Sequence, residues 1–397
     1  MVGRLLALTL LAWAAGAAAQ HEHGDPAKAA AKASLRAKSG LAVGAALSPA
    51  GQLWVVGLDR EARLFVRTSE DFGQHWNESR LLDIGGDKVA ADGENRPKIA
   101  FGAQGEVVIS YTQPLAKPYT GEIRMLRSDD GGRSFSAPRT VHADRQVITH
   151  RFESLAFDRD GVLHAVWIDK RDQVLARNKG GAYRGAAIYR NESRDGGRSF
   201  GPDIKLADHS CECCRIALAP TPEGGVAAMW RHVFAPNIRD HAFGVLGVAP
   251  AAPVRASYDE WKLDACPHHG PGLAPAPGGG FHAVWFGEKA GRTAVRYGRL
   301  TAAGSPVGDV RELPDPRAEH ADVASAGPWV AVVWRSFDGT QTRLRAWLSG
   351  DEGGHFVLRE LAASTEENDH PRLLADADGI HVLWRTAKEI HVLPVLP

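Results

Sequence analysis

The four cysteines of this chain lie in two short segments that also contain histidine. The segments read HSCECC and DACPHH, and their candidate ligands are Cys211, Cys213, Cys214, Cys266, His268 and His269. Thiolate and imidazole side chains together suit Cu(I), Zn(II) or a related soft to borderline ion, and three or four of them complete a site. The sequence therefore predicts a metal site, with copper favoured and zinc as the alternative.

The same cysteines allow a second interpretation. An exported protein with four cysteines commonly carries two disulfides, and here Cys211 or Cys213 could bridge to Cys266. Cys213 and Cys214 are adjacent in the chain, and adjacent cysteines bridge only with strain. Structural disulfides, or a redox-active thiol pair, therefore stay open beside metal binding.

These segments occupy fixed places in a repeat. Seven stretches share a short apolar strand, a turn with glycine and a second strand that usually ends in an aromatic, as in RFESLAFDRDGVLHAVW. The turn glycines recur about every fifty residues, and a period of that length built only of strands is typical of four-stranded propeller blades. The sequence predicts one all-β propeller over residues 40–397, with seven blades and six as the alternative.

The repeat brings the cysteines and histidines into register. Aligned on their inner strands, the two segments give the pairs Cys211 with Cys266, Cys213 with His268, and Cys214 with His269. Three more histidines lie three or four residues before other inner strands: His150, His320 and His370. All inner strands of a propeller start on the same face, so we expect these nine residues to meet at one mouth of the central channel.

A second motif recurs in four of the repeats, as SEDFGQHW, SDDGGRSF, SRDGGRSF and SGDEGGHF. It resembles the Asp-box, S-x-D-x-G-x-x-W/F, of the BNR repeats in sialidases and related propellers. The resemblance covers nearly the whole chain after residue 40 and implies a sialidase-like propeller. It also implies that the aspartates are structural residues of tight turns, namely Asp71, Asp130, Asp195 and Asp351.

The resemblance raises a sialidase-type glycoside hydrolase as an alternative function. Sialidases use three arginines on the sugar carboxylate, a tyrosine nucleophile backed by a glutamate, and an aspartate as acid/base. The candidate sugar-binding arginines near inner strands are Arg96, Arg151, Arg215, Arg335 and Arg385. A late nucleophilic tyrosine is not identifiable, because the last tyrosine is Tyr297. Exo-sialidase activity or anionic-glycan binding is therefore the second hypothesis, and a disulfide-stapled binding scaffold is the third.

The N-terminus indicates where the protein is located, and the charge balance limits the kinds of partner it can bind. Residues 1–19 read as a secretory signal, with Arg4 before an apolar run and small residues at Ala17 to Ala19, so we expect a secreted or periplasmic protein. Residues 20–39 read as an Ala/Lys/His-containing tether, and no later segment is apolar enough to span a bilayer. Lys+Arg 47 and Asp+Glu 47 cancel, which argues against a nucleic-acid partner. The expected partner is a metal ion or a small anionic or glycan ligand.

Overall fold

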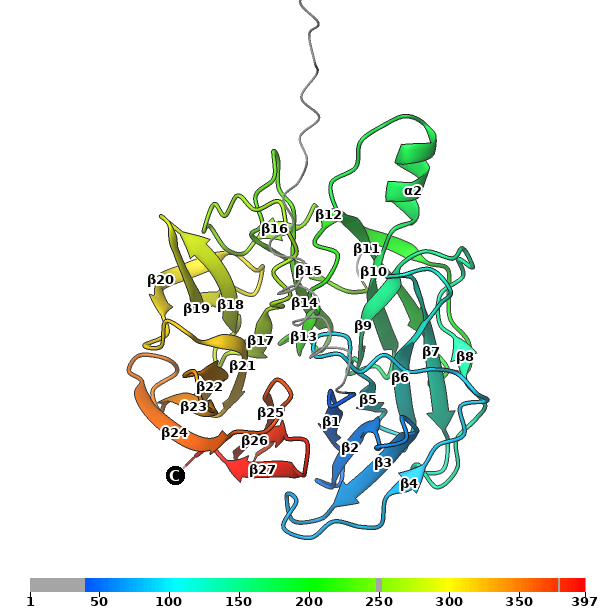
Figure 1. Ribbon diagram of the computed structural model, residues 1–397, viewed down its shortest axis with the longest axis horizontal. Coiled ribbons are helices and arrows are strands. Elements are labelled where there is room, and N and C mark those ends of the chain that lie inside the picture. The colour runs from blue at the N-terminus through cyan, green and yellow to red at the C-terminus, as the bar shows by residue number, and fades with distance from the viewer. Residues whose placement is uncertain (1–39, 248–251, 378, 397) are drawn as a thin grey trace, which may run out of the picture. The chain divides into compact units, whose positions relative to one another are not determined.

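The computed structural model describes residues 40–247, 252–377 and 379–396. Within these residues, seven antiparallel sheets surround a central axis as the blades of a propeller (Figure 1). Six sheets have four strands and the last has three. The prediction of seven blades is confirmed, and the six-bladed alternative is wrong. The predicted signal (1–19) and tether (20–39) lie outside the described residues.

In each blade the chain runs outward, so that strands adjacent in sequence are adjacent in the sheet. Blade 1 contains β1 (Gly44–Leu47), β2 (Leu53–Leu58), β3 (Leu64–Ser69) and β4 (Arg80–Leu81). Blade 2 contains β5 (Lys98–Phe101), β6 (Val107–Pro114), β7 (Gly121–Ser128) and β8 (Arg139–Thr140). Blade 3 contains β9 (His150–Phe157), β10 (Leu163–Asp169), β11 (Ala186–Ser193) and β12 (Ile204–Ser210), with helix α2 (Arg171–Asn178) between its second and third strands.

The later blades repeat the plan. Blade 4 contains β13 (Ala217–Pro220), β14 (Val226–Arg231), β15 (His241–Val245) and β16 (Val254–Arg255). Blade 5 contains β17 (Gly272–Pro275), β18 (Phe281–Lys289), β19 (Arg292–Leu300) and β20 (Pro306–Glu312). Blade 6 contains β21 (Glu319–Ala326), β22 (Trp329–Phe337), β23 (Thr342–Ser349) and β24 (Val357–Ser364), and blade 7 contains β25 (Arg372–Ala375), β26 (Ile380–Arg385) and β27 (Ile390–Pro394).

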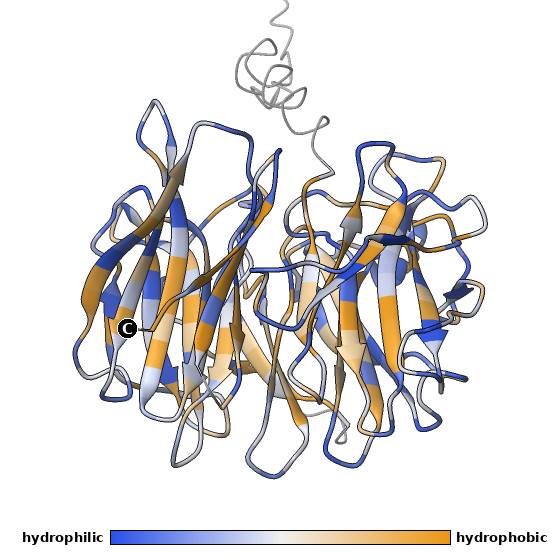
Figure 2. Cartoon of the chain, turned by 90° about the horizontal axis from the view of Figure 1, so that it is seen from below, coloured by the Kyte–Doolittle hydropathy of each residue, from blue (hydrophilic) through white to orange (hydrophobic). Residues whose placement is uncertain are grey.

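The core lies between neighbouring blades. The second strand of each blade is rich in Val, Ala and Trp and is mostly buried, because a blade packs against another blade on both of its faces. Near the ends of these strands lie aromatics, which include four fully buried tryptophans, Trp167, Trp230, Trp334 and Trp384. In Figure 2 the hydrophobic segments lie mainly along the strands, whereas the loops at both ends are mostly hydrophilic. Burying such a side chain stabilises the fold by roughly 1.5–3 kcal/mol, so the repeat of apolar strands accounts for the ring.

The ring closes where blade 7 meets blade 1. Val43, which precedes β1, packs with Leu374 and Leu383 of blade 7. A carboxylate of blade 7, Asp369, accepts hydrogen bonds from the backbone N–H of Val43 at 3.2 Å and from Arg96 Nη1 at 2.8 Å.

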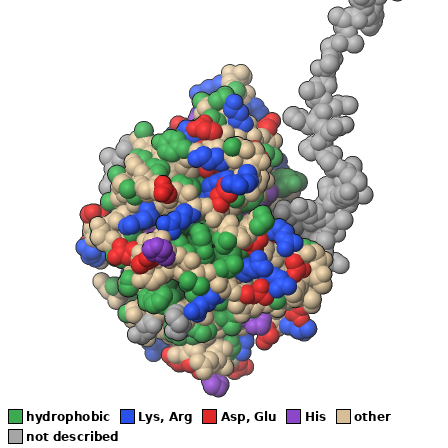
Figure 3. Space-filling view, turned by 90° about the vertical axis from the view of Figure 1, so that its left-hand side faces the viewer, with side chains coloured by type: hydrophobic (Ala, Val, Ile, Leu, Met, Phe, Trp, Pro, Cys, Tyr) green, Lys and Arg blue, Asp and Glu red, His purple; other side chains and the backbone are tan. Residues whose placement is uncertain are grey.

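The surface carries charges of both signs. On the side of the molecule drawn in Figure 3, lysine and arginine side chains are interspersed with aspartate and glutamate. This mixture matches the overall balance of charges in the sequence. Among the residues that the structure describes, no helix has the length and apolar character needed to cross a membrane.

Candidate functional site

Strand register places polar side chains at the mouth of the channel. In each blade, one residue of the innermost strand pairs with the residue just before the aromatic of the second strand. The position concerned lies two residues before that inner-strand residue. In four blades this position is occupied by Arg96, Arg215, His320 and His370. All four side chains are buried. The loops that lead into the inner strands therefore converge there, as the repeat predicts.

Glu94, in the loop before β5, lies at the centre of this group. Its Oε1 accepts a hydrogen bond from Arg215 Nη1 at 3.0 Å and lies 3.3 Å from His320 Nδ1 and 3.5 Å from His370 Nδ1. Its Oε2 accepts from the backbone N–H groups of Arg215 and Gly270. Burial alone would raise the pKa of Glu94, but the charge of Arg215 and the two imidazole hydrogen bonds hold it well below its usual value. One anion thus joins the loops of five blades.

Three of the predicted histidines form a stack beside Glu94. The rings of His269 and His320 lie 4.2 Å apart, and those of His320 and His370 lie 3.4 Å apart, nearly parallel. Burial is the main cause that lowers the pKa of each imidazole well below its usual value. The imidazoles are therefore neutral at pH 7, the form that can coordinate a metal ion. Ligand atoms of Glu94, His320 and His370 lie within 4.8 Å of one another, a group that could hold an ion.

Two of the predicted sugar-binding arginines form ion pairs inside the protein. Arg96 pairs with Asp369 at 2.8 Å, and Arg215 pairs with Glu94. Burial lowers the pKa of Arg96 to about 10, so it is still charged at neutral pH. Because a carboxylate of the protein already neutralises each guanidinium, these two side chains hold the blades together.

Two others bind backbone carbonyls. Arg335 Nη1 donates to the carbonyl of Asn368 at 2.7 Å, and Arg385 Nη2 donates to the carbonyl of Leu58 at 2.8 Å. Both contacts join neighbouring blades. The fifth arginine, Arg151, is different because it lines a cleft.

This cleft has a volume of about 320 Å³ and lies between Arg151 and the loop of residues 114–120, which joins β6 to β7. Tyr119, at the tip of the loop, is 81% exposed. Its carbonyl accepts a hydrogen bond from Thr149 Oγ1 at 2.7 Å, which fixes the loop beside the start of β9. Arg151 Nη2 lies 3.7 Å from Asp92 Oδ2. The cleft therefore combines an aromatic ring with cationic side chains.

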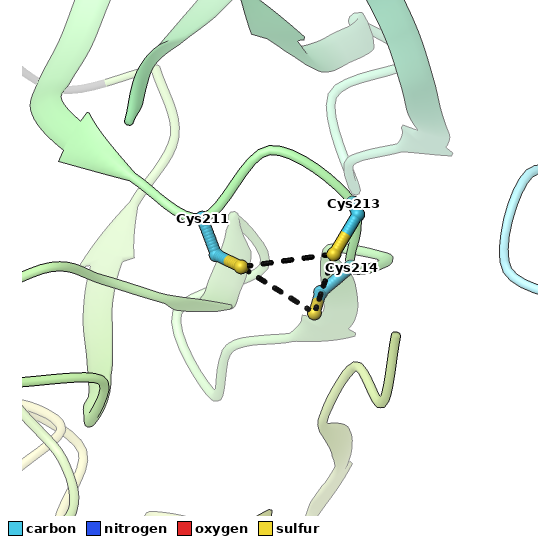
Figure 4. A group of neighbouring side chains, drawn as sticks. All are labelled: Cys211, Cys213 and Cys214. Atoms are coloured by element: carbon cyan, nitrogen blue, oxygen red, sulfur yellow. Dashed lines mark hydrogen bonds between the residues drawn. The ribbon is translucent and has the colours of Figure 1, made fainter. Parts of the chain in front are cut away.

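Cys211, Cys213 and Cys214 form a triangle of sulfur atoms between β12 and β13 (Figure 4). The three Sγ to Sγ distances are 3.8, 3.9 and 3.9 Å, whereas a disulfide bond is about 2.05 Å. All three are buried as free cysteines. Hydrogen bonds from the other two thiols lower the pKa of Cys211 well below its usual value, and the same contacts raise that of Cys213. The ionisation of each of these thiols therefore depends on its neighbours in the triangle.

The fourth cysteine lies beside this triangle on the surface. Cys266 is exposed, and hydrogen bonding with Cys211 raises the pKa of Cys266 to about 11. A guanidinium also reaches the triangle, because Arg239 Nη1 donates to Cys211 Sγ at 3.3 Å while its Nε donates to the carbonyl of Leu263 at 2.9 Å. The two cysteine segments therefore adjoin, as their repeat positions predict.

His150 lies in a different environment from the other predicted ligands. It is the first residue of β9, its ring stacks on His142 at 4.0 Å, and its Nε2 lies 3.3 Å from Asp144 Oδ1 and 3.7 Å from Asp169 Oδ2. His268, half-buried in the loop before β17, belongs to no group of ligand atoms within 4.8 Å among the described residues. The nine predicted ligands therefore occupy separate places, and the expected single site divides into a cysteine triangle and a histidine stack.

Four Ser–Asp turns follow the third strands of blades 1, 2, 3 and 6. In each turn the serine hydroxyl donates to the aspartate, whose carboxylate accepts the N–H of the residue four positions later; the aspartates are Asp71, Asp130, Asp195 and Asp351. In blade 1, hydrogen bonding to the backbone N–H of His75 is the main cause that lowers the pKa of Asp71 to about 2. These carboxylates act within their own turns.

Tyr297 does not supply the sialidase nucleophile that the sequence leaves unidentified. It lies in β19, is buried, and its hydroxyl is 2.7 Å from His282 Nδ1. Burial raises its pKa to about 12, which opposes formation of a phenolate.

The closed ring of seven sheets defines a seven-bladed β-propeller. No protein-family model and no curated protein matches the sequence. Among solved structures, the chain is similar to a polysaccharide lyase, an ulvan lyase bound to -[GlcA(1-4)Rha3S]-, with a TM-score of 0.57 and 14% identity over 90% of this chain and 94% of that chain.

Two glycosidases are further structural neighbours. An α-L-arabinofuranosidase from Fusarium graminearum, in complex with an iminosugar inhibitor, aligns with a TM-score of 0.51 and 12% identity over 74% of this chain and 87% of that chain. The NanB sialidase from Streptococcus pneumoniae aligns with a TM-score of 0.47 and 8% identity over 82% of this chain and 68% of that chain. At 14% and 12% identity, the likeness to the ulvan lyase and to the arabinofuranosidase is one of fold.

Proposed function

We propose that the protein binds an anionic glycan in the cleft between Arg151 and residues 114–120. The observation that carries the proposal is the meeting in one cleft of an exposed aromatic ring, Tyr119, with two cationic side chains, Lys117 and Arg151. The cleft volume of about 320 Å³ falls in the range of small-ligand sites, roughly 300–1,000 Å³.

Tyr119 has the properties of a contact residue. Its backbone φ of 61° lies in the left-handed region, which bulky residues rarely adopt, and its ring is exposed although burial would be favourable. The ring offers a flat apolar surface to the C–H face of a sugar, and its hydroxyl offers a hydrogen bond.

Arg151 and Lys117 supply the charge. Arg151 Nη2 forms a long ion pair with Asp92 Oδ2, at 3.7 Å, and the Asp92 side chain is 56% exposed, so a ligand anion can compete for the guanidinium. The guanidinium also lies 5.0 Å above the ring of Phe152, which orients it. A planar guanidinium matches a carboxylate or sulfate group in two parallel hydrogen bonds, and the exposed ammonium of Lys117 adds attraction.

The structural neighbours support a carbohydrate ligand. The bound ligand of the ulvan lyase, -[GlcA(1-4)Rha3S]-, contains an acidic sugar, and the arabinofuranosidase is also a carbohydrate-active enzyme. A shared fold does not by itself transfer function, so the chemistry of the cleft remains the main support. The proposal is one of binding.

Isothermal titration calorimetry with matched acidic and neutral oligosaccharides tests the proposal. We expect oligoglucuronides, sulfated oligosaccharides or sialyllactose to bind, neutral counterparts not to bind, and Tyr119→Ala to weaken binding by about tenfold. The matched control is Tyr258→Ala, which removes another exposed tyrosine (53%) outside the cleft. The proposal fails if no acidic oligosaccharide binds the folded protein, or if Tyr119→Ala binds as tightly as the Tyr258→Ala control.

A further inference from the structure

We propose that Cys211, Cys213 and Cys214 together bind one Cu(I) ion as a three-thiolate site. This site is separate from the glycan cleft and does not depend on it. Its basis is the placement of the three sulfur atoms, the fixing of their loop and the surroundings of the triangle.

The sulfur triangle has the size of a metal–thiolate site. Its edges of 3.8, 3.9 and 3.9 Å are nearly equal, and Figure 4 shows the three sulfurs turned toward one another. An ion at the centre would lie about 2.2 Å from each sulfur, close to the metal–sulfur distance of about 2.3 Å in zinc thiolate sites. An ion could therefore bind without movement of the loop.

The loop that carries the cysteines is held on several sides. The backbone N–H of Cys211 donates to the carbonyl of Arg231 at 2.9 Å. Between the cysteines, the carboxylate of Glu212 forms an ion pair with Lys170, and it accepts a hydrogen bond at 3.1 Å from Gln173 of α2. After them, Arg215 is tied to Glu94. Such a loop preorganises its ligands, because little freedom remains to be lost when an ion binds.

The surroundings suit a soft cation. The three cysteines belong to an apolar cluster with Phe152, Ile216 and Trp230, which excludes water. Three thiolates and one Cu(I) leave a net charge of minus two, and the guanidinium of Arg239, bonded to Cys211 Sγ at 3.3 Å, offsets part of it. Binding releases the thiol protons to solvent and requires no change in oxidation state of the ion.

The number of sulfurs favours Cu(I) over Zn(II). Structural zinc sites take four ligands in tetrahedral geometry. Here the triangle supplies three. The remaining cysteine, Cys266, contacts Cys211 from the surface, but it is exposed and is not one of the ligand atoms that all lie within 4.8 Å of one another. Thiolates select Cu(I), which is satisfied by three of them. We therefore assign the triangle to Cu(I) and treat a four-cysteine zinc site as the competing outcome.

The test is an anaerobic titration of the reduced full chain with Cu(I), in competition with a chromogenic Cu(I) chelator. We expect one ion per chain, and X-ray absorption should give three sulfur neighbours at about 2.2–2.3 Å. Cys213→Ser and Cys214→Ser should each weaken binding by more than roughly 100-fold, more than the loss of an outer-shell partner costs. The matched control, Cys266→Ser, should bind as the unmodified chain does.

Circular dichroism and thermal melting of each metal-free variant establish that it is folded. If one of the two buried substitutions prevents folding, the other variant and the absorption measurement on the unmodified chain still test the three-thiolate site. Four sulfur neighbours with loss of binding in Cys266→Ser would overturn the three-thiolate site, as would a reduced, folded chain that leaves all Cu(I) on the chelator. Glycan binding is measured separately, so failure of one proposal leaves the other standing.

Discussion

Glu94 and Arg215 form a buried ion pair at 3.0 Å across 121 positions of the sequence. Arg215 directly follows the cysteine triangle, and its Nη2 also donates to the carbonyl of Ala321 at 2.6 Å. One side chain therefore links blade 4 to blades 2 and 6. The channel mouth and the cysteine loop belong to the same network of buried contacts.

Removing the charge of Glu94 should destabilise the whole propeller. In Glu94→Gln the guanidinium of Arg215 stays buried without its anion, and breaking a buried pair in this way costs about 3–5 kcal/mol. The change in free energy of unfolding is measured by urea denaturation. Glu61→Gln is the matched control, because the pair of Glu61 with Arg63 is exposed and should contribute less than about 1 kcal/mol. Equal effects of the two substitutions would contradict the role of Glu94.

The buried histidines should make the protein less stable in mild acid. The folded-state pKa values of His320 and His370 lie well below 6.5, so below about pH 6.5 the unfolded chain binds protons that the folded chain does not. The free energy of unfolding should therefore fall by about 1 kcal/mol per pH unit for each imidazole. Glu94 acts in the same direction below its ordinary value of 4.5. Denaturation at pH 7.5 and 5.5 gives the slope of the free energy of unfolding against pH. His370→Gln should reduce this slope by the contribution of about one proton. An unchanged slope would refute the assignment of His370 as a buried, neutral imidazole.

The Ser–Asp turns should contribute to stability. In blade 3, the buried Ser193 hydroxyl donates to Asp195 and accepts the N–H of Gly197, both at 2.7 Å. Ser193→Ala leaves that N–H without its partner and should cost about 1–2 kcal/mol. Thermal melting compares it with Ser305→Ala, a substitution at an exposed serine. A melting temperature equal to that of Ser305→Ala would mean that the turn is dispensable.

The cysteines should differ in reactivity. In the reduced, metal-free protein, exposed Cys266 should be alkylated by iodoacetamide before Cys211, Cys213 and Cys214, which are buried. Because the pKa of Cys266 is raised to about 11, its rate should increase about tenfold per pH unit between pH 7 and 10. Mass spectrometry of peptides at timed intervals measures each site. Simultaneous modification of all four would show that the triangle is not closed to solvent.

Glycan binding should depend on salt. The ammonium of Lys117 is exposed, so its attraction for a carboxylate or sulfate is screened at high ionic strength. We expect Lys117→Ala to weaken binding of an acidic oligosaccharide roughly threefold to fivefold at low salt and to reduce the salt dependence. Titration at two salt concentrations makes the comparison. An affinity independent of salt in the unmodified chain would argue that charge plays no part.

The sequence predicts the blades because each blade repeats the same pattern of apolar strands and packs against its neighbours in the same way. Strands such as β10 and β22 contain a mostly apolar run that leads to a tryptophan, and neighbouring blades cover both of their faces. The number of turn glycines then gives the number of blades. The three strands of blade 7 also follow from the apolar runs near the C-terminus.

The site is less predictable because it depends on strand register. His320 and His370 share one position of the repeat, but in blade 3 that position holds Phe152, and His150 lies two residues earlier. At its place two residues earlier, His150 contacts His142, Asp144 and Asp169. Glu94 gives no local signal, since its partners are distant in sequence and only the closed ring brings them together.

The junction between blades 7 and 1 bears on how this protein is made. Val43 and Asp369, which meet there, are separated by 326 positions, so the entropy of closing that loop is incurred only once almost the entire chain exists. Without blade 7, the flank of blade 1 that carries Val43 has no partner to cover it. A chain truncated before residue 369 would therefore keep an uncovered apolar edge on blade 1.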